Sequence, residues 1–339
     1  MLSDPRSRSR AAVVAALLLG MVLGAGALRL AGGTGSDGES ARLAEGTVLP
    51  SPTTTPTPGT PTQFTISSLN VLGAGHTGPH GNKKGWASGE QRMRWLTNVI
   101  RAEGVDVIGL QEFELPQYRV FMEMAGDEYG IYPGQAWGPK ATRNSVAWKL
   151  DEWELVSASW VEIPYFHGNT MRMPVVLLRN LISGQEAYFS TFHNPANARG
   201  PAAKWRKQAT DIEIALVNRL RSESGLPVYV TGDMNERDIY FCRMTSGTDM
   251  LAANGGFNDG GSCGPARPTY IDWVFGSPET TFTEYAANRG PRIRRSTDHP
   301  MIVAQAALPP VVTDPDCPTP TPTATPTPTP TGPPTPNVP

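Results

Sequence analysis

The sequence is short of net charge and of cysteine. Its 339 residues carry 29 Lys and Arg against 31 Asp and Glu, and only three cysteines. Between residues 63 and 308 the two charge counts are 24 and 25, so this region has no general basic field that would attract nucleic acid. A nucleic-acid partner must be argued from local clusters, and three cysteines leave at least one without an intramolecular partner.

The N-terminal residues predict an export signal. Arg6, Arg8 and Arg10 precede an unbroken apolar run over residues 11–28. We expect residues 1–30 to be either a cleaved signal peptide or an uncleaved signal anchor, because the 18 apolar residues are just enough to span a bilayer. The protein should then be exported, secreted or anchored at the cell surface, with membrane contact only through this segment if it stays uncleaved.

Two Thr- and Pro-rich stretches, residues 31–62 and 309–339, flank the middle of the chain. Neither can bury enough apolar surface to fold, so we expect a disordered linker and a disordered tail. The Thr-Pro repeats of the tail favour an extended spacer or an O-glycosylated stalk. The remaining residues, 63–308, have the size of one ordinary domain, which we expect to be monomeric.

The pattern within 63–308 predicts many strands and few helices. Ser88 and Gln91 form a capping box that opens a helix ending near Gly104. A second helix is expected from Pro201 to about Gly225. The expected strands are 64–69, 105–110, 145–150, 175–178, 187–192, 228–231, 271–275 and 301–305.

The stretch over residues 227–236 ends an apolar strand with Asp233 and Asn235. Residues two apart in an extended chain point the same way, so both side chains can reach one hard centre, a divalent cation or the phosphate that it holds. Taken alone, the stretch is equally well explained as a turn whose Asp and Asn close the backbone on itself.

Other strand ends carry the same kind of residue. Asn70 ends the first strand, Glu112 ends the second, Asp272 lies in a third, and Thr297-Asp-His-Pro300 precedes the last. This ordered set resembles the endonuclease/exonuclease/phosphatase superfamily, the deoxyribonuclease I-like metal-dependent phosphoesterases, over roughly residues 63–308. The resemblance implies an α/β fold, a four-layer sandwich of two mainly antiparallel sheets flanked by helices.

The resemblance also implies roles for these residues. It makes Asn70, Glu112 and Asp298 the metal site, holding Mg²⁺, with Mn²⁺ or Ca²⁺ as alternatives. It makes His299 the general base or a phosphate-binding group, oriented by the carboxylate of Asp272, because an imidazole needs a fixed tautomer to take a proton. The remaining catalytic residues of the set are His193, Asp233 and Asn235.

Further residues follow from the same resemblance. Arg172 resembles the phosphate-contacting arginine of the nuclease branch, and Asn144 is a second candidate for phosphate binding. Secreted relatives carry a disulfide where this chain has Cys242 and Cys263, which an exported protein can oxidise; Cys317 is left over. We interpret the other histidines as surface residues, since no metal-ligand spacing links them: His76, His80 and His167.

The substrate expected from these features is a phosphodiester, with nucleic acid favoured over lipid. Local arginines, Arg172, Arg292, Arg294 and Arg295, should lie beside the metal site of an extracellular endonuclease that cuts DNA or RNA. One alternative is a sphingomyelinase-like phospholipid phosphodiesterase, which would need an exposed aromatic hairpin made of Trp153, Trp160, Tyr165 and Phe166. An alternative of another class is a non-catalytic surface binding module.

Overall fold

A computed structural model describes residues 61–310, all of which fall within one compact unit. The expected export signal, all but the last two residues of the expected linker, and all but the first two of the tail lie outside the described residues. Among the helices that the structure describes, none is long and apolar enough to cross a membrane.

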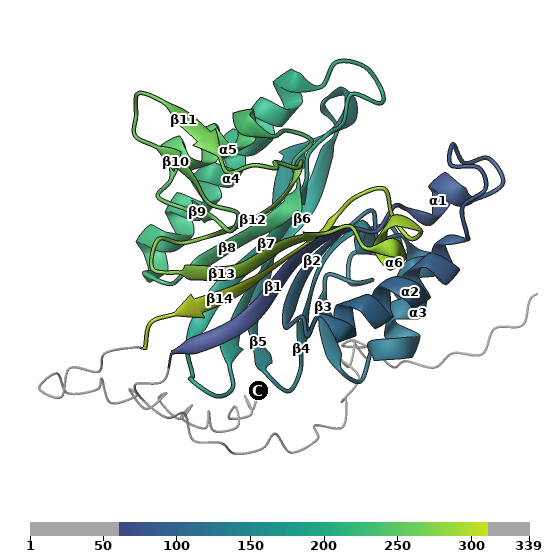
Figure 1. Ribbon diagram of the computed structural model, residues 1–339, viewed down its shortest axis with the longest axis horizontal. Helices are drawn as coiled ribbons and strands as arrows, with labels where there is room; N and C mark the ends of the chain where they lie inside the picture. Colours follow the sequence, from purple (N-terminus) through teal and green to yellow (C-terminus); the bar gives the residue numbers. More distant parts are fainter. Residues whose placement is uncertain (1–60, 311–339) are drawn as a thin grey trace, which may run out of the picture. The chain divides into compact units, whose positions relative to one another are not determined.

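The described chain alternates strands with a few helices (Figure 1). The strands are β1 Thr62–Asn70, β2 Val107–Gln111, β3 Tyr129–Tyr132, β4 Asn144–Lys149, β5 Trp153–Pro164, β6 Thr170–Asn180, β7 Glu186–His193, β8 Val228–Asp233, β9 Leu251–Ala252, β10 Gly256–Asn258, β11 Cys263–Pro265, β12 Asp272–Gly276, β13 Thr281–Asn288 and β14 Met301–Leu308. The helices are α1 Ala74–Thr77, α2 Gly89–Ala102, α3 Leu115–Ala125, α4 Ala203–Ser224, α5 Asp238–Gly247 and α6 Pro291–Arg294, with short 3-10 turns at Ala141–Arg143 and Phe166–Gly168.

Two six-stranded sheets form the centre of the fold. One has the order β13-β14-β1-β2-β4-β3 and the other the order β5-β6-β7-β8-β12-β9. Only β1 with β2 and β7 with β8 pair in parallel within these sheets; their other pairs are antiparallel. The expectation of two mainly antiparallel sheets is confirmed.

The layers are held by three apolar cores. Between the sheets, Phe64 packs edge-on against Trp153 and Tyr229 with ring centroids 5.2 Å away in both cases. A second core joins the first sheet to α2 and α3, and a third joins the other sheet to α4 and α5. Figure 1 shows these two helix pairs on opposite sides of the sheets. The chain is therefore a four-layer α/β sandwich.

Local sequence signals explain the two long helices. Ser88 caps α2, where its hydroxyl accepts a hydrogen bond from the Gln91 amide at 3.3 Å. Gly225 ends α4 in the left-handed region at φ 71°, where a residue with a Cβ is disfavoured. The sequence predicted that this helix begins at Pro201. In the structure α4 begins two residues later, at Ala203.

Strand register gathers the strand ends on which the site is built. The parallel pairing of β1 with β2 sets Asn70 opposite Gln111, directly before Glu112. In the other sheet, His193 of β7 and Asp272 of β12 both pair with Asp233 of β8. Strand pairing therefore places three catalytic candidates side by side, although they are far apart in the sequence.

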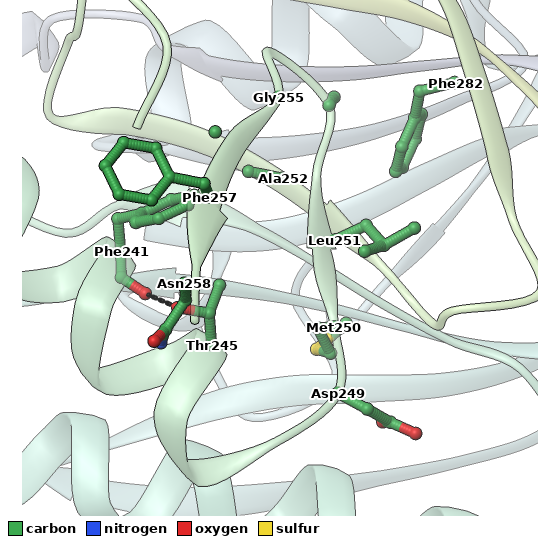
Figure 2. Close-up of a pocket in the computed structure, with 12 residues that line it drawn as sticks. Phe241, Thr245, Asp249, Met250, Leu251, Ala252, Gly255, Phe257, Asn258 and Phe282 are labelled. Carbon is green, nitrogen blue, oxygen red and sulfur yellow. Dashed lines mark hydrogen bonds between the residues drawn. The ribbon is translucent and has the colours of Figure 1, made fainter. Parts of the chain in front are cut away.

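A groove of about 440 Å³ lies between α5 and the strands β9 and β10 (Figure 2). Cys242 and Cys263 are bonded and join α5 to β11. Phe241, Phe257 and Leu251 line the groove, and Phe257 is 57% exposed. None of the residues predicted to act in catalysis lines it. Cys317 lies outside the described residues.

Candidate active site

Asp233 stands at the centre of the polar cluster. Its Oδ2 accepts a hydrogen bond from Asn70 Nδ2 at 3.0 Å, and it lies 3.6 Å from His193 Nε2 and 3.7 Å from His299 Nε2. Its Oδ1 accepts a hydrogen bond from the backbone amide of Asn235 at 3.0 Å. The carboxylate therefore connects both sheets and both histidines through one group that is almost fully buried.

His299 forms a dyad with Asp272. His299 Nδ1 lies 2.9 Å from Asp272 Oδ1, so the carboxylate holds the ring with Nε2 directed toward Asp233. Burial lowers the pKa of His299, but the charges of Asp272 and Asp233 outweigh it and raise that pKa to about 10. The arrangement can keep a proton on the imidazole and direct it toward a bound phosphoryl oxygen.

Asp272 is buried, and its second oxygen has no hydrogen-bond partner among the described residues. Burial raises its pKa, while attraction to the His299 ring opposes that rise. An unpartnered buried carboxylate oxygen is costly unless a cation or proton lies nearby. Asp233, Asp272 and His299 also offer ligand atoms that all lie within 4.8 Å of one another.

Glu112 follows β2 with a backbone φ of 54°, a left-handed conformation that only a surrounding network makes tolerable for a glutamate. Its Oε1 accepts from Asn70 Nδ2 at 3.1 Å, and its Oε2 accepts from the Gly73 amide at 2.9 Å. Burial works to raise the pKa of Glu112, but the bond from His76, the charge of His193 and these amide donors hold it well below its usual range.

These residues fit a divalent metal. One amide, that of Asn70, bridges the carboxylates of Glu112 and Asp233, and carboxylate and carbonyl oxygens are the donors that Mg²⁺, Mn²⁺ and Ca²⁺ prefer. Asn70 Oδ1 accepts a hydrogen bond from the backbone amide of Leu72 at 3.0 Å, while its Nδ2 group positions the two carboxylates. The side chain of Asp298 is one-third exposed.

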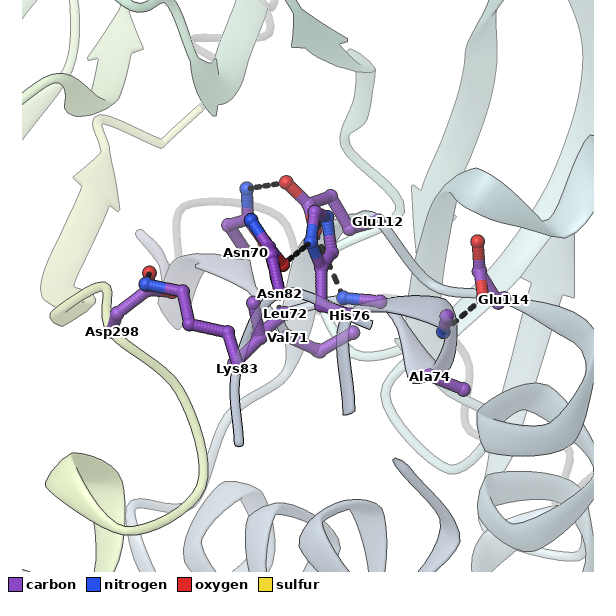
Figure 3. Close-up of polar contacts among 12 residues, drawn as sticks. Asn70, Val71, Leu72, Ala74, His76, Asn82, Lys83, Glu112, Glu114 and Asp298 are labelled. Atoms are coloured by element: carbon purple, nitrogen blue, oxygen red, sulfur yellow. Dashed lines mark hydrogen bonds and ion pairs between the residues drawn. The ribbon is translucent and has the colours of Figure 1, made fainter. Parts of the chain in front are cut away.

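His76 belongs to the site, contrary to our interpretation of it as a surface residue. Its Nε2 lies 3.2 Å from Glu112 Oε2, and Lys83 Nζ lies 2.7 Å from Asp298 Oδ2 (Figure 3). The hydrogen bond to Glu112 outweighs burial and raises the pKa of His76 to about 9. The sequence carried no spacing signal for these contacts, because His76 reaches Glu112 only through the fold.

A pocket of about 460 Å³ opens beside Glu112 and His193. Arg143 and Arg199 contribute positive charge to it, and Tyr165 Oη lies 3.4 Å from His193 Nδ1. On its Nδ1 side, His193 therefore faces a phenol. Asn144 also lines the pocket and is buried, with its Oδ1 free of partners among the described residues.

Arg172, which was predicted to contact phosphate, does not line this pocket. Met171 lines the pocket, and the next residue of β6 points to the opposite face because side chains alternate along a strand. Arg172 instead pairs with Glu162 at 3.2 Å and lies over the ring of Trp160 at 4.9 Å. The side-chain amide of Asn235 donates a hydrogen bond to the backbone oxygen of Asn194 at 2.8 Å. Asn235 therefore supports the backbone that follows β7.

The α6 arginines also fall outside the pocket lining, and Arg295 lies over Trp95 of α2 at 4.3 Å. Arg289 lies over Tyr270, with 5.7 Å from its Cζ to the ring centroid. The four aromatic residues lie on the β5–β6 hairpin, in β5 and in the loop that follows it, but they lie in different surroundings. Trp153 is fully buried in the core, Tyr165 and Phe166 line the pocket, and only Trp160 is well exposed, at 48%.

Known proteins share this architecture. A sequence model described as the endonuclease/exonuclease/phosphatase family matches residues 67–299. A family protein from Bacteroides thetaiotaomicron is similar at 18% identity and a TM-score of 0.59, over 74% of this chain and 96% of that chain. A mannosyl-6-phosphatase from the same species is similar at 18% identity and a TM-score of 0.57, over 72% and 99%.

The catalytic domain of human nocturnin with bound sulfate is similar at 16% identity and a TM-score of 0.56, over 72% of this chain and 94% of that chain. At such identities the likeness to solved structures establishes the fold alone. No curated protein matches the chain.

Proposed function

The chain belongs to the endonuclease/exonuclease/phosphatase family, whose members hydrolyse phosphoric esters, and we propose that it is a divalent-metal-dependent phosphodiesterase that cuts nucleic acid outside the cell. The observation that carries the proposal is the placement of Asp233 within 3.7 Å of both histidine Nε2 atoms, with His299 backed by Asp272. A non-catalytic binding module has no need of this arrangement.

The side chains divide the chemistry among them. Asp233 is the group best placed to accept a proton from an attacking water, because it is ionisable and central. His299, held by Asp272, and His193, held by Tyr165, are placed to bind phosphoryl oxygens or deliver a proton to the leaving oxygen. Both histidines face the same carboxylate, which is consistent with one reacting phosphate between them.

Glu112 and Asp298, with Asn70 positioning the glutamate, would hold the metal, for which Mg²⁺ is our first choice. When bound there, the metal neutralises charge on the phosphoryl oxygens and the leaving group.

The pocket walls support nucleic acid over a choline phospholipid. Arg143 and Arg199 supply two guanidinium groups, which suit phosphate better than a zwitterionic headgroup. The rings of Tyr165 and Phe166 lie 4.4 Å apart, and the guanidinium of Arg199 lies over Phe166 at 5.3 Å, which together offer a stacking surface for a base. The lipid alternative needs an exposed aromatic hairpin, and of its four aromatic residues only Trp160 is well exposed.

Export is supported by two features. The arginine-led apolar run at the N-terminus is typical of export signals, and the Cys242–Cys263 disulfide is of the kind that persists in oxidising compartments. Fractionation of expressing cells, followed by N-terminal sequencing of the protein, tests the location and separates a cleaved signal peptide from an anchor.

The activity is tested with purified protein, Mg²⁺ or Mn²⁺, and a panel of plasmid DNA, RNA, sphingomyelin vesicles, a sugar phosphate and a bis-phenyl phosphodiester. We expect the protein to cleave DNA or RNA as well as the generic diester. EDTA should abolish this cleavage. Hydrolysis of sphingomyelin alone would replace the nucleic-acid proposal with the lipid one. Action only on sugar phosphates would make the protein a phosphomonoesterase.

A further inference from the structure

A row of aromatic rings leads away from His193. The ring centroid of Tyr165 lies 5.7 Å from that of His193, and the ring centroid of Phe166 lies 4.4 Å from that of Tyr165. Phe166 also lines a second, smaller hollow of about 110 Å³, together with Pro201 and Trp205 at the start of α4. Aromatic side chains therefore continue from the catalytic histidine into a neighbouring space.

This hollow adjoins the catalytic pocket, because Phe166, His167 and Arg199 line both spaces. Pockets that hold a whole small molecule have volumes of about 300–1,000 Å³. A hollow of about 110 Å³ therefore suits one part of a ligand, the rest of which occupies the larger pocket. The hollow is an extension of the catalytic pocket.

The turn Phe166–Gly168 is fixed against Trp205. The Gly168 amide donates to Tyr165 O at 3.0 Å. Gly168 has a φ of 80°, and a Cβ there would lie 2.8 Å from Trp205 Cη2, so glycine is required where the turn approaches the ring. His167 is also left-handed, at φ 59°, a strained conformation that persists only where its surroundings hold it. The walls of the hollow are thus formed before a ligand binds.

Two cations lie over the rings of this hollow. The guanidinium of Arg199 lies over Phe166 at 5.3 Å, and Lys204 Nζ lies over Trp205 at 4.8 Å. Neither cation has a carboxylate partner among the described residues, and no acidic side chain is among those that line the hollow. A choline headgroup is itself a cation, so the two charges repel it. A ligand that combines flat rings with negative charge, such as a nucleotide, fits this surface.

We propose that this hollow, which we call the Trp205 subsite, binds the base of a nucleotide next to the one at the scissile phosphate, so that the substrate is a single-stranded nucleic acid. This rests on the proposed function, because it takes the catalytic pocket to hold a phosphodiester of a nucleic acid. One base stacks on the Tyr165–Phe166 surface and its neighbour on Trp205. Arg199, which lines both spaces, is placed to contact the phosphate between them.

The strand must be unpaired for this arrangement. Bases in a duplex are stacked on one another and paired, whereas the bases of a single strand can be splayed out onto aromatic side chains and guanidinium planes. The Trp205 subsite therefore distinguishes a single strand from a duplex, although both carry the same phosphates.

The measurement is the affinity of the purified full-length protein for a short single-stranded oligonucleotide and for a hairpin duplex, each made as DNA and as RNA. Fluorescence anisotropy in EDTA measures binding of the labelled strands without cleavage. Wild type should prefer the single strand. Trp205→Ala should weaken single-strand binding by about 5- to 50-fold, as expected for the loss of one stacked base, and should change hairpin binding by no more than about 2-fold.

The chain offers a matched tryptophan as a control. Trp160 is 48% exposed, has Arg172 over its ring at 4.9 Å, and lines neither the catalytic pocket nor the Trp205 subsite. Trp160→Ala should leave the preference for the single strand unchanged. Trp205→Phe, which keeps a flat ring in the subsite, should retain most of the wild-type affinity. Thermal unfolding curves establish that each variant is folded.

Lys204 provides a second readout. Lys204→Met should flatten the dependence of log Kd on log salt concentration for the single strand by about 0.7, the value for one phosphate contact. Lys207→Met removes the same charge from the same helix, where Lys207 pairs with Asp211 at 2.6 Å, and should leave this slope unchanged.

The outcomes separate the subsite from the proposed function. Equal losses for single strand and hairpin in Trp205→Ala, or a wild type that prefers the hairpin, would overturn the subsite while nucleic-acid cleavage stands. A Trp160→Ala effect as large as that of Trp205→Ala would overturn it as well. A protein that neither binds nor cleaves any of the four nucleic acids would remove the proposed function and the subsite together.

Discussion

At the scale of single residues, the site depends on side chains that have several partners each. Asn70 bridges Glu112 and Asp233, and Asp272 holds His299 while keeping one oxygen unpaired among the described residues. Loss of one such group disturbs its neighbours as well as its own contact, so single substitutions should have large effects on turnover and smaller effects on folding.

Glu112→Ala should abolish metal-dependent turnover, with a loss well beyond the roughly 10- to 100-fold typical of a residue that only supports a ligand. The reason is that Glu112 is the carboxylate best placed to bind the metal. Activity with Mg²⁺ and the thermal unfolding curve are the measurements. Glu123→Ala, which removes an exposed carboxylate of α3, should leave activity unchanged. Full Mg²⁺-dependent turnover by Glu112→Ala would show that the site is misassigned.

Asp272→Asn should lower kcat by about 10- to 100-fold with little change in KM, because the amide no longer stabilises a charged His299 ring but keeps its shape. Steady-state kinetics with the generic diester check this, and NMR titration of the ring should show a lower pKa for His299. Asp259→Asn, in an exposed loop, is the matched control. An equal loss of kcat in both variants would contradict the role of Asp272.

At the scale of elements, α4 buries polar residues as well as apolar ones. Arg206 is buried and pairs with Glu236 at 2.9 Å, and Glu213 is buried beneath the strand ends with Tyr240 Oη donating to it at 2.8 Å. Through this ion pair Arg206 braces the loop after β8. The helix thus supports the site as well as the core.

Glu213 should make stability depend on pH. Burial raises its pKa to about 7, above the unfolded value of about 4.3. The folded state therefore holds this proton more tightly, and the stabilisation is complete below about pH 4 and lost as pH rises through 7. Glu213→Gln, which keeps an acceptor for Tyr240, should gain about 3–4 kcal/mol of stability relative to wild type between pH 4 and pH 8.

Urea unfolding of wild type and Glu213→Gln from pH 4 to pH 8 gives the difference between their unfolding free energies. The contributions of the other titrating groups cancel in this difference. Glu223→Gln, an exposed glutamate on the same helix, should show no such divergence with pH. A difference that stays constant across this range would mean that Glu213 ionises normally.

The disulfide should stabilise the region between α5 and β11. Cys242 and Cys263 are 21 residues apart in sequence, and closing a loop of that length typically contributes about 2–4 kcal/mol. The double variant Cys242→Ser/Cys263→Ser should lose about this much unfolding free energy, whereas Cys317→Ser should lose none. Non-reducing peptide mapping should find Cys242 bonded to Cys263. A disulfide from Cys317 to either residue would contradict this pairing.

At the scale of the whole molecule, the near-neutral domain must bind a polyanion through its pocket. Arg143 and Arg199 are the guanidinium groups that line that pocket in the part of the chain that the structure describes. Each phosphate neutralised on a nucleic acid releases counterions, so binding weakens with salt.

Arg143→Ala/Arg199→Ala should raise KM for DNA or RNA several-fold and flatten its salt dependence by about 0.7–0.9 per lost phosphate contact, while sparing the generic diester. Arg294→Ala/Arg295→Ala, from outside the pocket, removes the same charge and is the control. Identical salt slopes for wild type and the pocket variant would argue against a polyanionic substrate held by these residues.

The sequence by itself determined the strand ends and their chemistry. Apolar β-branched runs ended by Asn70, Glu112, His193 and Asp233 predict buried strands with polar tips, because periodicity and turn signals are local. The missed strands show the limit of that reasoning. β3, β9, β10 and β11 are too short for a periodic signal, and β5 and β13 are exposed along most of their length, so the apolar run that marks a strand is absent.

Only the tertiary structure decided which side chains meet. Strand pairing aligns His193, Asp233 and Asp272, a loop closure brings His76 to Glu112, and the alternation of β6 turns Arg172 away from the pocket. These are long-range contacts between residues separated by tens to hundreds of positions, for example Asn70 and Asp233, which are 163 apart. No local pattern encodes such pairs, because they form through register and packing once the two sheets have come together.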